Sequence, residues 1–409
     1  MLHFTNTQLA TKHHISLGTV RNWIEASKDG KINLELYEGK DRTYIANTPT
    51  NTNKIKRLVA ERRKYRNSNA IKKITPKPRF YELFKEEDIH DILTSIEVNK
   101  EIPLQYNYYD VGAKSWSEYV EKIEHQEHDN SFHSAQEMLR ASKSTFDYLL
   151  SKYKRINIVD IGCGNSMPAR SVLKRLLEEG KLGRYIAIDI SQEMLNIAKR
   201  NVDGWFDGEV QFEGYRRNIS QERFADLLIP EYHSGSNKET VNVVLLLGYT
   251  LHNMKRPESG YRSIYDSMGK DDLLIEDIKL DSEVSRGYFD FDADPGQSKL
   301  SPLNAIVFEL MNIDPSCYNV ELGFDEKRMQ RFEQIRFKVA VEIDVKFGEG
   351  TRVIELNKGD TILMWRVLHM SCDDVLRQKS NMDFSVMHSL QTVDNLYMLT
   401  ISRVKQRVK

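Results

Sequence analysis

The sequence predicts an α/β protein organised around a parallel β-sheet, with a small basic module in front of it. Three observations lead to this prediction. Short apolar runs rich in β-branched residues recur at 156–161, 184–190 and 241–248, which is typical of buried parallel strands. A glycine-rich turn and a helix-like segment (167–179) follow the first run. The first 80 residues contain 17 Lys or Arg against 6 Asp or Glu.

The turn after the first strand reads V-D-I-G-C-G and contains Asp160, Gly162 and Gly164. Glycine lets the backbone approach a ligand closely, because no Cβ stands in the way. A buried strand that runs into such a turn and then a helix is typical of a cofactor loop. Ordinary strand–helix corners also carry two glycines, so the turn alone leaves both readings open.

The second strand ends in Asp189, 27 residues after Gly162. A carboxylate at this position can accept hydrogen bonds from both ribose hydroxyls of a nucleoside that lies across the strand ends. The alternative is that Asp189 caps the helix expected at 191–200, since Asp is a common N-cap. The two signals together favour the nucleoside site.

The segments V-D-I-G-C-G, A-I-D-I-S and V-N-V-V-L-L-L-G resemble class I S-adenosylmethionine-dependent methyltransferases. Within that group they are similar to the histidine-specific N-methyltransferases of ergothioneine synthesis, over roughly residues 100–405. The resemblance implies a Rossmann-like domain with an appended α+β substrate domain, and S-adenosyl-L-methionine as the cofactor. The cofactor-binding residues that it implies are Asp160, Gly162, Gly164, Asp189, Asn218 and Gly248.

Asn218 stands where that family usually has an acidic residue that binds the adenine amino group. The side-chain carbonyl of Asn can accept the same hydrogen bond. We therefore keep Asn218 as the expected adenine contact. The lysine that the family carries shortly after the glycine loop is missing here.

Three residues are expected to serve the methyl acceptor: Asn253, Tyr109 and Tyr288. Asn253 ends the turn G-Y-T-L-H-N, and a neutral amine needs a hydrogen-bond acceptor that directs its lone pair. Tyr109 and Tyr288 align with the substrate-side tyrosines of the family. The alternative for the first tyrosine cluster (106, 108 and 109) is that these rings are simply packed in a core.

Two departures from the family pattern argue against free histidine as the acceptor. The glutamate and serine that hold the histidine ring in that family fall on Trp365 and Val367 here. Loss of both partners would leave a buried polar ring unpaired, at a cost of about 1–3 kcal/mol for each group. We expect a small amine or amino-acid-like acceptor instead.

The N-terminal residues resemble the winged helix-turn-helix of the MerR and excisionase type. Thr5 or Asn6 can cap a first helix and Ser16 a second one, and residues 34–45 read as a β-wing. The predicted contacts with double-stranded DNA are Thr19, Arg21, Asn22 and Arg42. The balance of +11 over residues 1–80 favours a polyanion partner. The alternatives are a solvated helix face, a solubilising basic tail or a protein contact.

The predicted domains are a winged helix-turn-helix at 1–67, a linker at 68–80, a methyltransferase domain at 81–280 and 371–409 that begins with a helical lead-in (81–152), and a substrate-binding insertion at 281–370. Further in, 271–280 reads as a core strand, 301–312 as an amphipathic helix, and 336–345 and 351–356 as antiparallel strands. Residues 390–404 should return to the main sheet.

The bulk properties are those expected of a cytoplasmic protein. No apolar run in the 409 residues reaches membrane-spanning length, and the three cysteines lie far apart. His125, His128 and His133 have a spacing that metal ligands could use, but the surrounding acids and amides are typical of a solvated helix end, so we predict no metal. The oligomeric state is open, with a homodimer as one alternative.

Three functions are compatible with these motifs. The first is a methyltransferase acting on a small molecule and fused to a DNA-binding module. The second is a transcriptional regulator whose methyltransferase-like body senses a ligand. The third, a DNA- or RNA-directed methyltransferase, is disfavoured because the chain lacks a P-P-aromatic motif and a Pro-Cys nucleophile, and because its body is acidic.

Overall fold

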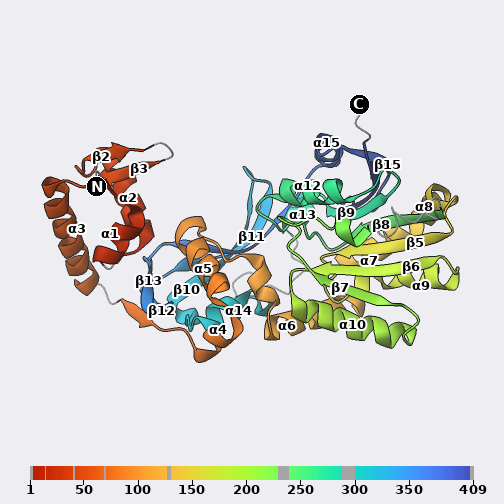
Figure 1. Cartoon of the computed structure of the whole chain (residues 1–409), viewed down its shortest axis with the longest axis horizontal. Helices are drawn as coiled ribbons and strands as arrows, with labels where there is room; N and C mark the ends of the chain where they lie inside the picture. The colour runs from red at the N-terminus through yellow and green to blue at the C-terminus, as the bar shows by residue number, and fades with distance from the viewer. Residues whose placement is uncertain are drawn as a thin grey trace.

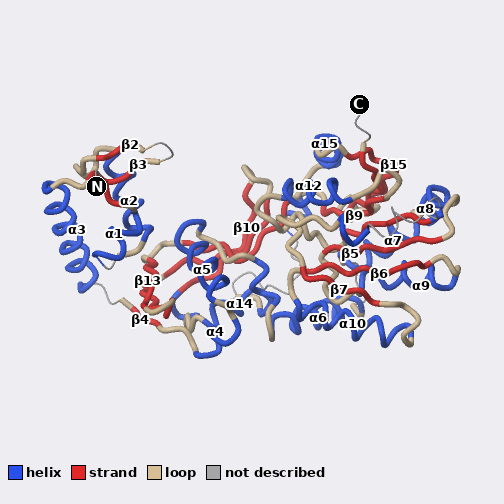
Figure 2. The backbone as a smooth tube through the Cα atoms, in the orientation of Figure 1, coloured by secondary structure: helices blue, strands red, loops and turns tan. Residues whose placement is uncertain are grey.

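The computed structural model describes residues 3–13, 15–39, 42–68, 71–126, 130–228, 239–287 and 300–405, with only the backbone for 62–68. These residues form three bodies that follow one another along the long axis of the molecule (Figures 1 and 2). The N-terminal module lies at one end, a body with two small sheets lies in the middle, and a body with one large sheet lies at the other end.

The N-terminal module packs helices against a small antiparallel sheet with the order β1–β3–β2. Its elements are β1 (His3–Phe4), α1 (Asn6–His13), α2 (Leu17–Lys28), β2 (Leu36–Glu38), β3 (Thr43–Ala46) and α3 (Pro49–Ser68). The predicted caps are confirmed: Thr5 exchanges hydrogen bonds with Gln8 at the start of α1, and Ser16 Oγ accepts from Thr19 N. Val20, Trp23 and Ile24 of α2 are buried together with Ile15.

The large sheet has seven strands in the order β15–β16–β9–β8–β5–β6–β7. Strands β5 to β9 run parallel, and β16 is antiparallel to β9 and β15. The strands are β5 (Arg155–Ile161), β6 (Leu182–Asp189), β7 (Phe212–Arg216), β8 (Thr240–Leu246), β9 (Leu273–Lys279), β15 (Phe384–Gln391) and β16 (Tyr397–Val404). The three predicted strands become the centre of this sheet, which is Rossmann-like.

Helices cover both faces of the large sheet (Figure 1). One face packs against α7 (Ser131–Ala141), α8 (Lys143–Leu150), α9 (Arg170–Glu178) and α10 (Gln192–Phe206). The other face packs against α12 (Pro257–Ser267) and the segment around Phe224. Parallel strands are expected to be covered in this way, because their side chains are apolar on both sides.

The middle body contains two three-stranded sheets, ordered β10–β11–β14 and β13–β12–β4. Their strands are β4 (Lys72–Ile74), β10 (Tyr318–Asp325), β11 (Gln330–Phe337), β12 (Val341–Phe347), β13 (Gly350–Leu356) and β14 (Thr361–Leu368). Helices α4 (Pro78–Leu83), α5 (Glu86–Thr94) and α14 (Pro302–Leu310) share one apolar core with these sheets. The π-helix η1 (Ser95–Asn99) continues α5.

Three expectations about this body are wrong. The predicted linker contains β4, which pairs in parallel with β12 and buries Ile74. The predicted strand 336–345 is the end of β11 and the start of β12, which belong to different sheets. The helical lead-in splits, because α4 and α5 share the core of the middle body while α7 and α8 pack on the large sheet. Helix α14 forms as predicted but is buried on nearly all sides rather than on one face.

Further helices among the described residues lie within or between these bodies. They are the 3₁₀ turns η2 (Leu104–Tyr108), η3 (Met167–Ala169) and η5 (Pro315–Cys317), and the α-helices α6 (Val111–Glu124), α13 (Glu283–Gly287) and α15 (Cys372–Asn381). Among the described residues, no helix is both long and apolar enough to cross a membrane.

Candidate active site

A cavity of about 660 Å³ lies where the carboxyl ends of β5, β6 and β8 meet the middle body. Its walls come from the turn after each of these strands, from η2 and α6, and from β14. A crevice at the carboxyl ends of parallel strands is the usual ligand site of such sheets, and this volume suits a ligand of drug size. The motifs that the sequence analysis singled out therefore meet at one place.

The glycine turn after β5 forms one wall. Gly162 and Gly164 have φ of +64° and +54°, a region in which a side chain is strained. A Cβ on Gly162 would lie 2.5 Å from Thr250 Oγ1, which belongs to the turn after β8. The backbone N–H of Gly164 donates to Asp189 Oδ2 at 3.1 Å. Both glycines are thus favoured by the backbone conformation, and Gly162 is also required by the close packing of the turn after β8.

Asp189 lies in the cavity wall at the end of β6, where it was predicted. It accepts from Gly164 N and, at 2.9 Å, from Ser191 N. The N-cap of α10 is Ser191, whose hydroxyl accepts a hydrogen bond from Met194 N. Asp189 is therefore not the N-cap of this helix. Burial raises the pKa of Asp189 to about 6, although its backbone N–H donors act in the opposite direction.

Asp160 does not line the cavity. It is buried and accepts a hydrogen bond from Tyr185 Oη at 2.8 Å, and the same Tyr185 hydroxyl lies 2.7 Å from Ser166 Oγ. Burial raises the pKa of Asp160 to about 7. Asp160 therefore supports the glycine turn from below, instead of lining the cavity as expected.

The turn after β8 brings Gly248 and Asn253 to the cavity, as predicted. Gly248 has φ of +87°, and its N–H donates to buried Asp277 Oδ1 at 2.8 Å. Asn253 Oδ1 is buried and has no hydrogen-bond partner among the described residues. On the same turn, the carbonyl oxygen of His252 accepts from Leu368 N at 2.9 Å, which ties the turn to the end of β14.

Asn218 lines the cavity, but its side-chain oxygen is already occupied. It accepts from Ser220 N at 3.1 Å and from Ser220 Oγ at 2.6 Å. A carbonyl oxygen has two lone pairs, so the expected contact with an adenine amine would have to displace Ser220.

The predicted tyrosine is displaced by one position. Tyr108 lines the cavity, with its ring edge-on to Trp116 at 5.7 Å. Tyr109 does not line it, because its ring packs on Phe84 at 5.3 Å in the core of the middle body. Burial first, and Asp189 second, raise the pKa of Tyr108. The packed-core alternative holds for Tyr109, and Tyr288 lies outside the described residues.

The wall opposite the cofactor motifs comes from the middle body. Trp365 and Arg366 of β14 line the cavity together with Glu101, whereas Val367 is buried elsewhere. Glu101 forms ion pairs with Arg366 and, at 3.1 Å, with Lys255. Sequence reasoning found Trp365 through the family resemblance but missed Glu101, Lys255 and Arg366. They are far apart in the chain, so no local motif could reveal them.

The four predicted DNA contacts divide into two sets. Arg21, Asn22 and Arg42 are exposed. Thr19 does not project from α2 as predicted: it is buried and donates to Glu355 Oε2 of β13 at 3.1 Å. The start of α2 thus docks on the middle body.

The histidine-rich segment forms local hydrogen bonds. His125 Nδ1 lies 2.7 Å from Glu121 O, and His133 Nε2 lies 2.9 Å from Glu124 O, while His128 is outside the described residues. Within the described ranges, no group of three or more His, Cys, Asp or Glu side chains is arranged to hold a metal ion.

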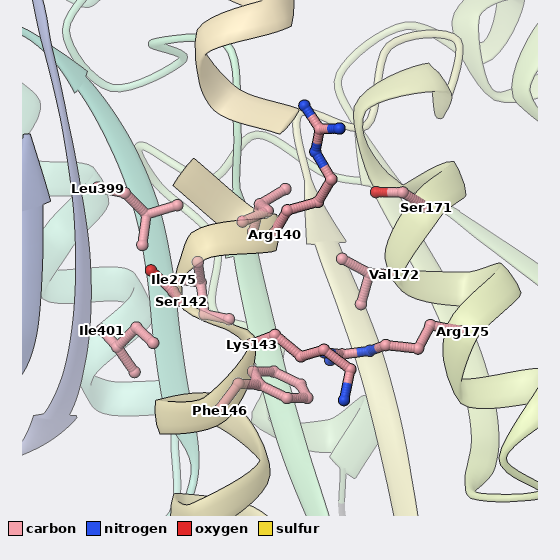
Figure 3. Close-up of a pocket in the computed structure, with 11 residues that line it drawn as sticks. Arg140, Ser142, Lys143, Phe146, Ser171, Val172, Arg175, Ile275, Leu399 and Ile401 are labelled. Carbon is pink, nitrogen blue, oxygen red and sulfur yellow. The ribbon is translucent and has the colours of Figure 1, made fainter. Parts of the chain in front are cut away.

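A second, smaller pocket of about 130 Å³ lies between α7, α8, α9 and the strands β9 and β16. Figure 3 shows an apolar floor that includes Ile275, Leu399 and Ile401, with Arg140 extending away from it. None of the predicted site residues lines it, and it is far smaller than typical cofactor pockets. The large cavity is therefore the candidate active site.

Comparison with known proteins identifies a family for most of the chain. A family model described as histidine-specific, S-adenosylmethionine-dependent methyltransferase matches residues 85–404. No curated protein matches the chain.

Several solved structures resemble the chain at low identity. One is an S-adenosylmethionine-dependent methyltransferase from Clostridium acetobutylicum ATCC 824, at 10% identity and TM-score 0.41, covering 72% of this chain and 99% of that one. Another is the 1,6-didemethyltoxoflavin-N1-methyltransferase of Burkholderia thailandensis with S-adenosylhomocysteine, at 11% identity and TM-score 0.34, covering 72% of this chain and 88% of that one. Likenesses this remote carry no argument, so the assignment rests on the family match.

Proposed function

The chain belongs to the family of histidine-specific, S-adenosylmethionine-dependent methyltransferases, and from this premise we propose that it N-methylates a small amine or amino-acid-like acceptor other than free histidine. It is a methyltransferase whose cofactor is S-adenosyl-L-methionine. The nature of the acceptor and the roles of individual residues are the proposal.

The residues in the cavity fit this cofactor. The turn at Gly162 and Gly164 leaves no side chain between the backbone and a ligand, and Asp189 lies at the strand end where a ribose would be held. When bound, the cofactor supplies a methyl group on a sulfonium with a good leaving group. The protein then has to provide alignment and proximity more than strong acid–base catalysis.

The observation that carries the proposal is the unpaired oxygen of Asn253. A buried carbonyl without a partner costs about 1–3 kcal/mol, and this one belongs to a residue that lines the cavity. An N–H of a neutral amine would satisfy it and would thereby direct the nitrogen lone pair. The tie between His252 and β14 fixes the turn that carries Asn253. Tyr108 lies in the cavity wall and is the better candidate than Tyr109 for a substrate contact.

One side of the cavity, formed by Glu101, Lys255, Trp365 and Arg366, is called the acceptor wall below. Its composition supports an acceptor other than free histidine. Trp365 faces the cavity where the family pattern has a glutamate, and Val367 replaces the serine and is buried away from it. An indole can stack on a planar group or pack against an aliphatic one, but it offers no acceptor to an imidazole N–H.

Replacement of Asn253 by alanine tests this role. We expect Asn253→Ala to keep the affinity for S-adenosylhomocysteine within about twofold, and to lower kcat about 100-fold, the usual effect of losing one aligned catalytic group. Calorimetry and transfer of radiolabelled methyl groups to a pool of amines measure the two quantities. Asn196→Ala, on the exposed side of α10, is the matched control. Normal binding together with full turnover in Asn253→Ala would exclude the role.

We also propose that the N-terminal module is a winged helix-turn-helix that binds double-stranded DNA through Arg21, Asn22 and Arg42. The support is its two capped helices, its antiparallel hairpin and its positive charge. Fluorescence anisotropy with a labelled 30-base-pair duplex tests this proposal. Arg21→Gln with Arg42→Gln should weaken binding and lower its salt dependence, whereas unchanged binding in this variant would contradict it.

The second candidate function is a regulator whose methyltransferase-like body senses a ligand. The buried hydrogen bond from Thr19 to Glu355 favours it, because it joins the module to the body that forms the acceptor wall. Cofactor binding without transfer to any amine in the pool would support this candidate over the enzyme.

A further inference from the structure

The acceptor wall of the cavity carries more positive than negative charge. Three cationic side chains line it, Lys255, Arg256 and Arg366, against one carboxylate, Glu101. The next carboxylate in the lining, Asp189, lies at the cofactor turns and is engaged by the backbone N–H groups of Gly164 and Ser191. The acceptor wall therefore has an excess of about two positive charges.

Glu101 is fully engaged by two of these cations. One of its oxygens pairs with Lys255 Nζ at 3.1 Å, and the other pairs with Arg366 Nη2. A carboxylate held in this way has little capacity left for a cationic ligand. It fixes the positions of Lys255 and Arg366 and leaves their remaining donors for a ligand.

Arg366 is the most enclosed of the cations. Its side chain is 15% exposed, and its hydrogen bond to Glu101 is the one it makes among the described residues. A guanidinium has five N–H donors in a planar fork that matches a carboxylate or a phosphate. Burial lowers the pKa of Arg366, because desolvation penalises the charged guanidinium.

We propose that the methyl acceptor carries an anionic group, a carboxylate or a phosphate, which Arg366 and Lys255 bind beside Trp365. This inference rests on the proposed function and names its substrate class: an acidic amine rather than a neutral or polycationic one. Asn253 and Lys255 belong to the same turn, so the residue that aligns the amine and one that binds the anion are positioned together.

The test uses simple probes on the full-length protein saturated with S-adenosylhomocysteine, which leaves the acceptor wall open. Isothermal calorimetry measures glutarate, inorganic phosphate and 1,5-diaminopentane. We expect one of the two anions to bind, and the comparison of glutarate with phosphate identifies the group. Lys255→Gln and Arg366→Gln should each weaken that anion at least 10-fold, and the diamine should give no signal.

Two further variants keep the result interpretable. Arg366→Gln leaves Glu101 with one partner, so the double variant with Glu101→Gln removes the buried charge while still deleting the guanidinium. Arg140→Gln removes an arginine from the second pocket (Figure 3) and should leave anion affinity unchanged. Lys255 is exposed, so its replacement should not disturb folding.

Each outcome is decisive. If neither anion binds, if Lys255→Gln and the Arg366 variants bind it as the wild type does, or if Arg140→Gln weakens it equally, the inference is wrong. A fall in S-adenosylhomocysteine affinity in Arg366→Gln would assign the cations to the cofactor's own carboxylate, which also overturns it. Failure of the wild-type protein to bind S-adenosylhomocysteine would instead refute the proposed function, since that measurement involves no anion.

Discussion

The two walls of the active-site cavity differ in what lines them: mainly backbone turns on one side and long side chains on the other. The cofactor wall consists of backbone turns with glycines, and of the carboxylate of Asp189, at the carboxyl ends of adjacent parallel strands. The acceptor wall combines Glu101, Trp365 and Arg366 of the middle body with Lys255, which stands on the turn after β8 that also carries Gly248 and Asn253. A fixed cofactor can be held by a contiguous and rigid frame, whereas the acceptor is selected by side chains that can change without disturbing the sheet.

The strongest test of this contrast is Gly162→Ala, which should damage the cofactor wall most. The new Cβ would lie 2.5 Å from Thr250 Oγ1 on a backbone with φ of +64°. We expect the affinity for S-adenosylhomocysteine to fall at least 100-fold in calorimetry. Gly180→Ala is a matched control, because Gly180 also has φ of +64° but has no atom within 4 Å of the added Cβ. It should cost about 1–2 kcal/mol of stability and leave affinity unchanged. Equal affinities in both variants would refute the packing argument.

Asp189→Asn should have the next largest effect and should separate binding from stability. We expect S-adenosylhomocysteine to bind at least about 10-fold more weakly at pH 7.5, because one charge-assisted hydrogen bond contributes about 1.5–3 kcal/mol. Burial raises the pKa of Asp189 to about 6, so wild-type affinity should decline as the pH falls below about 6, and the variant should lack this component. Asp160 and Asp277, with pKa values raised to about 7, titrate in both proteins and cancel in the comparison.

The same substitution should act with the opposite sign on folding. When the pKa of a carboxyl is higher in the folded than in the unfolded state, the protein loses stability as the pH rises through the folded-state pKa. Ionised Asp189 therefore destabilises the unliganded protein at pH 8, and Asp189→Asn should unfold at a higher temperature in calorimetry. A lower unfolding temperature would mean that the hydrogen bonds from Gly164 and Ser191 outweigh the burial of the charge.

A smaller effect distinguishes the two adjacent tyrosines. Tyr108 lines the cavity, and Tyr109 packs against the core of the middle body. We expect Tyr108→Phe to change the acceptor KM or the cofactor affinity by about 3- to 10-fold, and Tyr109→Phe by less than twofold, since a typical hydrogen bond contributes about 0.5–1.5 kcal/mol. Steady-state kinetics with the acceptor found in the amine pool measures both. The reverse order would restore the sequence-based assignment of Tyr109.

The smallest effect on the cavity is expected from Thr19→Val. It removes the buried hydrogen bond to Glu355 and should cost about 1–2 kcal/mol of stability, while the affinity for S-adenosylhomocysteine stays within twofold. Thr43→Val is the matched control, because Thr43 makes the same type of bond to Glu38 in an exposed hairpin. Denaturant titration compares the two. Equal and negligible losses would show that α2 is not held by Thr19.

The cofactor wall could be predicted from sequence because its determinants are local. Each strand runs directly into its own glycine turn or ends in its own carboxylate, and the helix caps at Thr5 and Ser16 need no distant partner. The acceptor wall could not be predicted in the same way. Glu101 and Arg366 are 265 residues apart, and their pairing depends on how β14 meets the end of η1.

Other misses have equally specific causes. Tyr108 and Tyr109 sit at the end of a 3₁₀ turn, where successive side chains point about 120° apart, so a shift of one position exchanges cavity for core. The segment Lys72–Ile74 has the sequence of a linker, but in the structure it forms a strand that pairs with β12. The sequence predicts that Thr19 faces solvent on α2, but in the structure it donates a hydrogen bond to Glu355 of β13.

The π-helix η1 lies next to α2 and leads along the chain to Glu101 in the cavity wall. The backbone of α2 approaches it, since a Cβ on Gly18 would lie 3.8 Å from the carbonyl oxygen of Glu97, and the chain reaches Glu101 four residues later. If an anion bound at Arg366 displaced Glu101, and if η1 carried that displacement to its contact with Gly18, the position of α2 would change. By thermodynamic reciprocity, a change that detaches α2 from η1 would then alter the affinity of the cavity for the anion by the same factor.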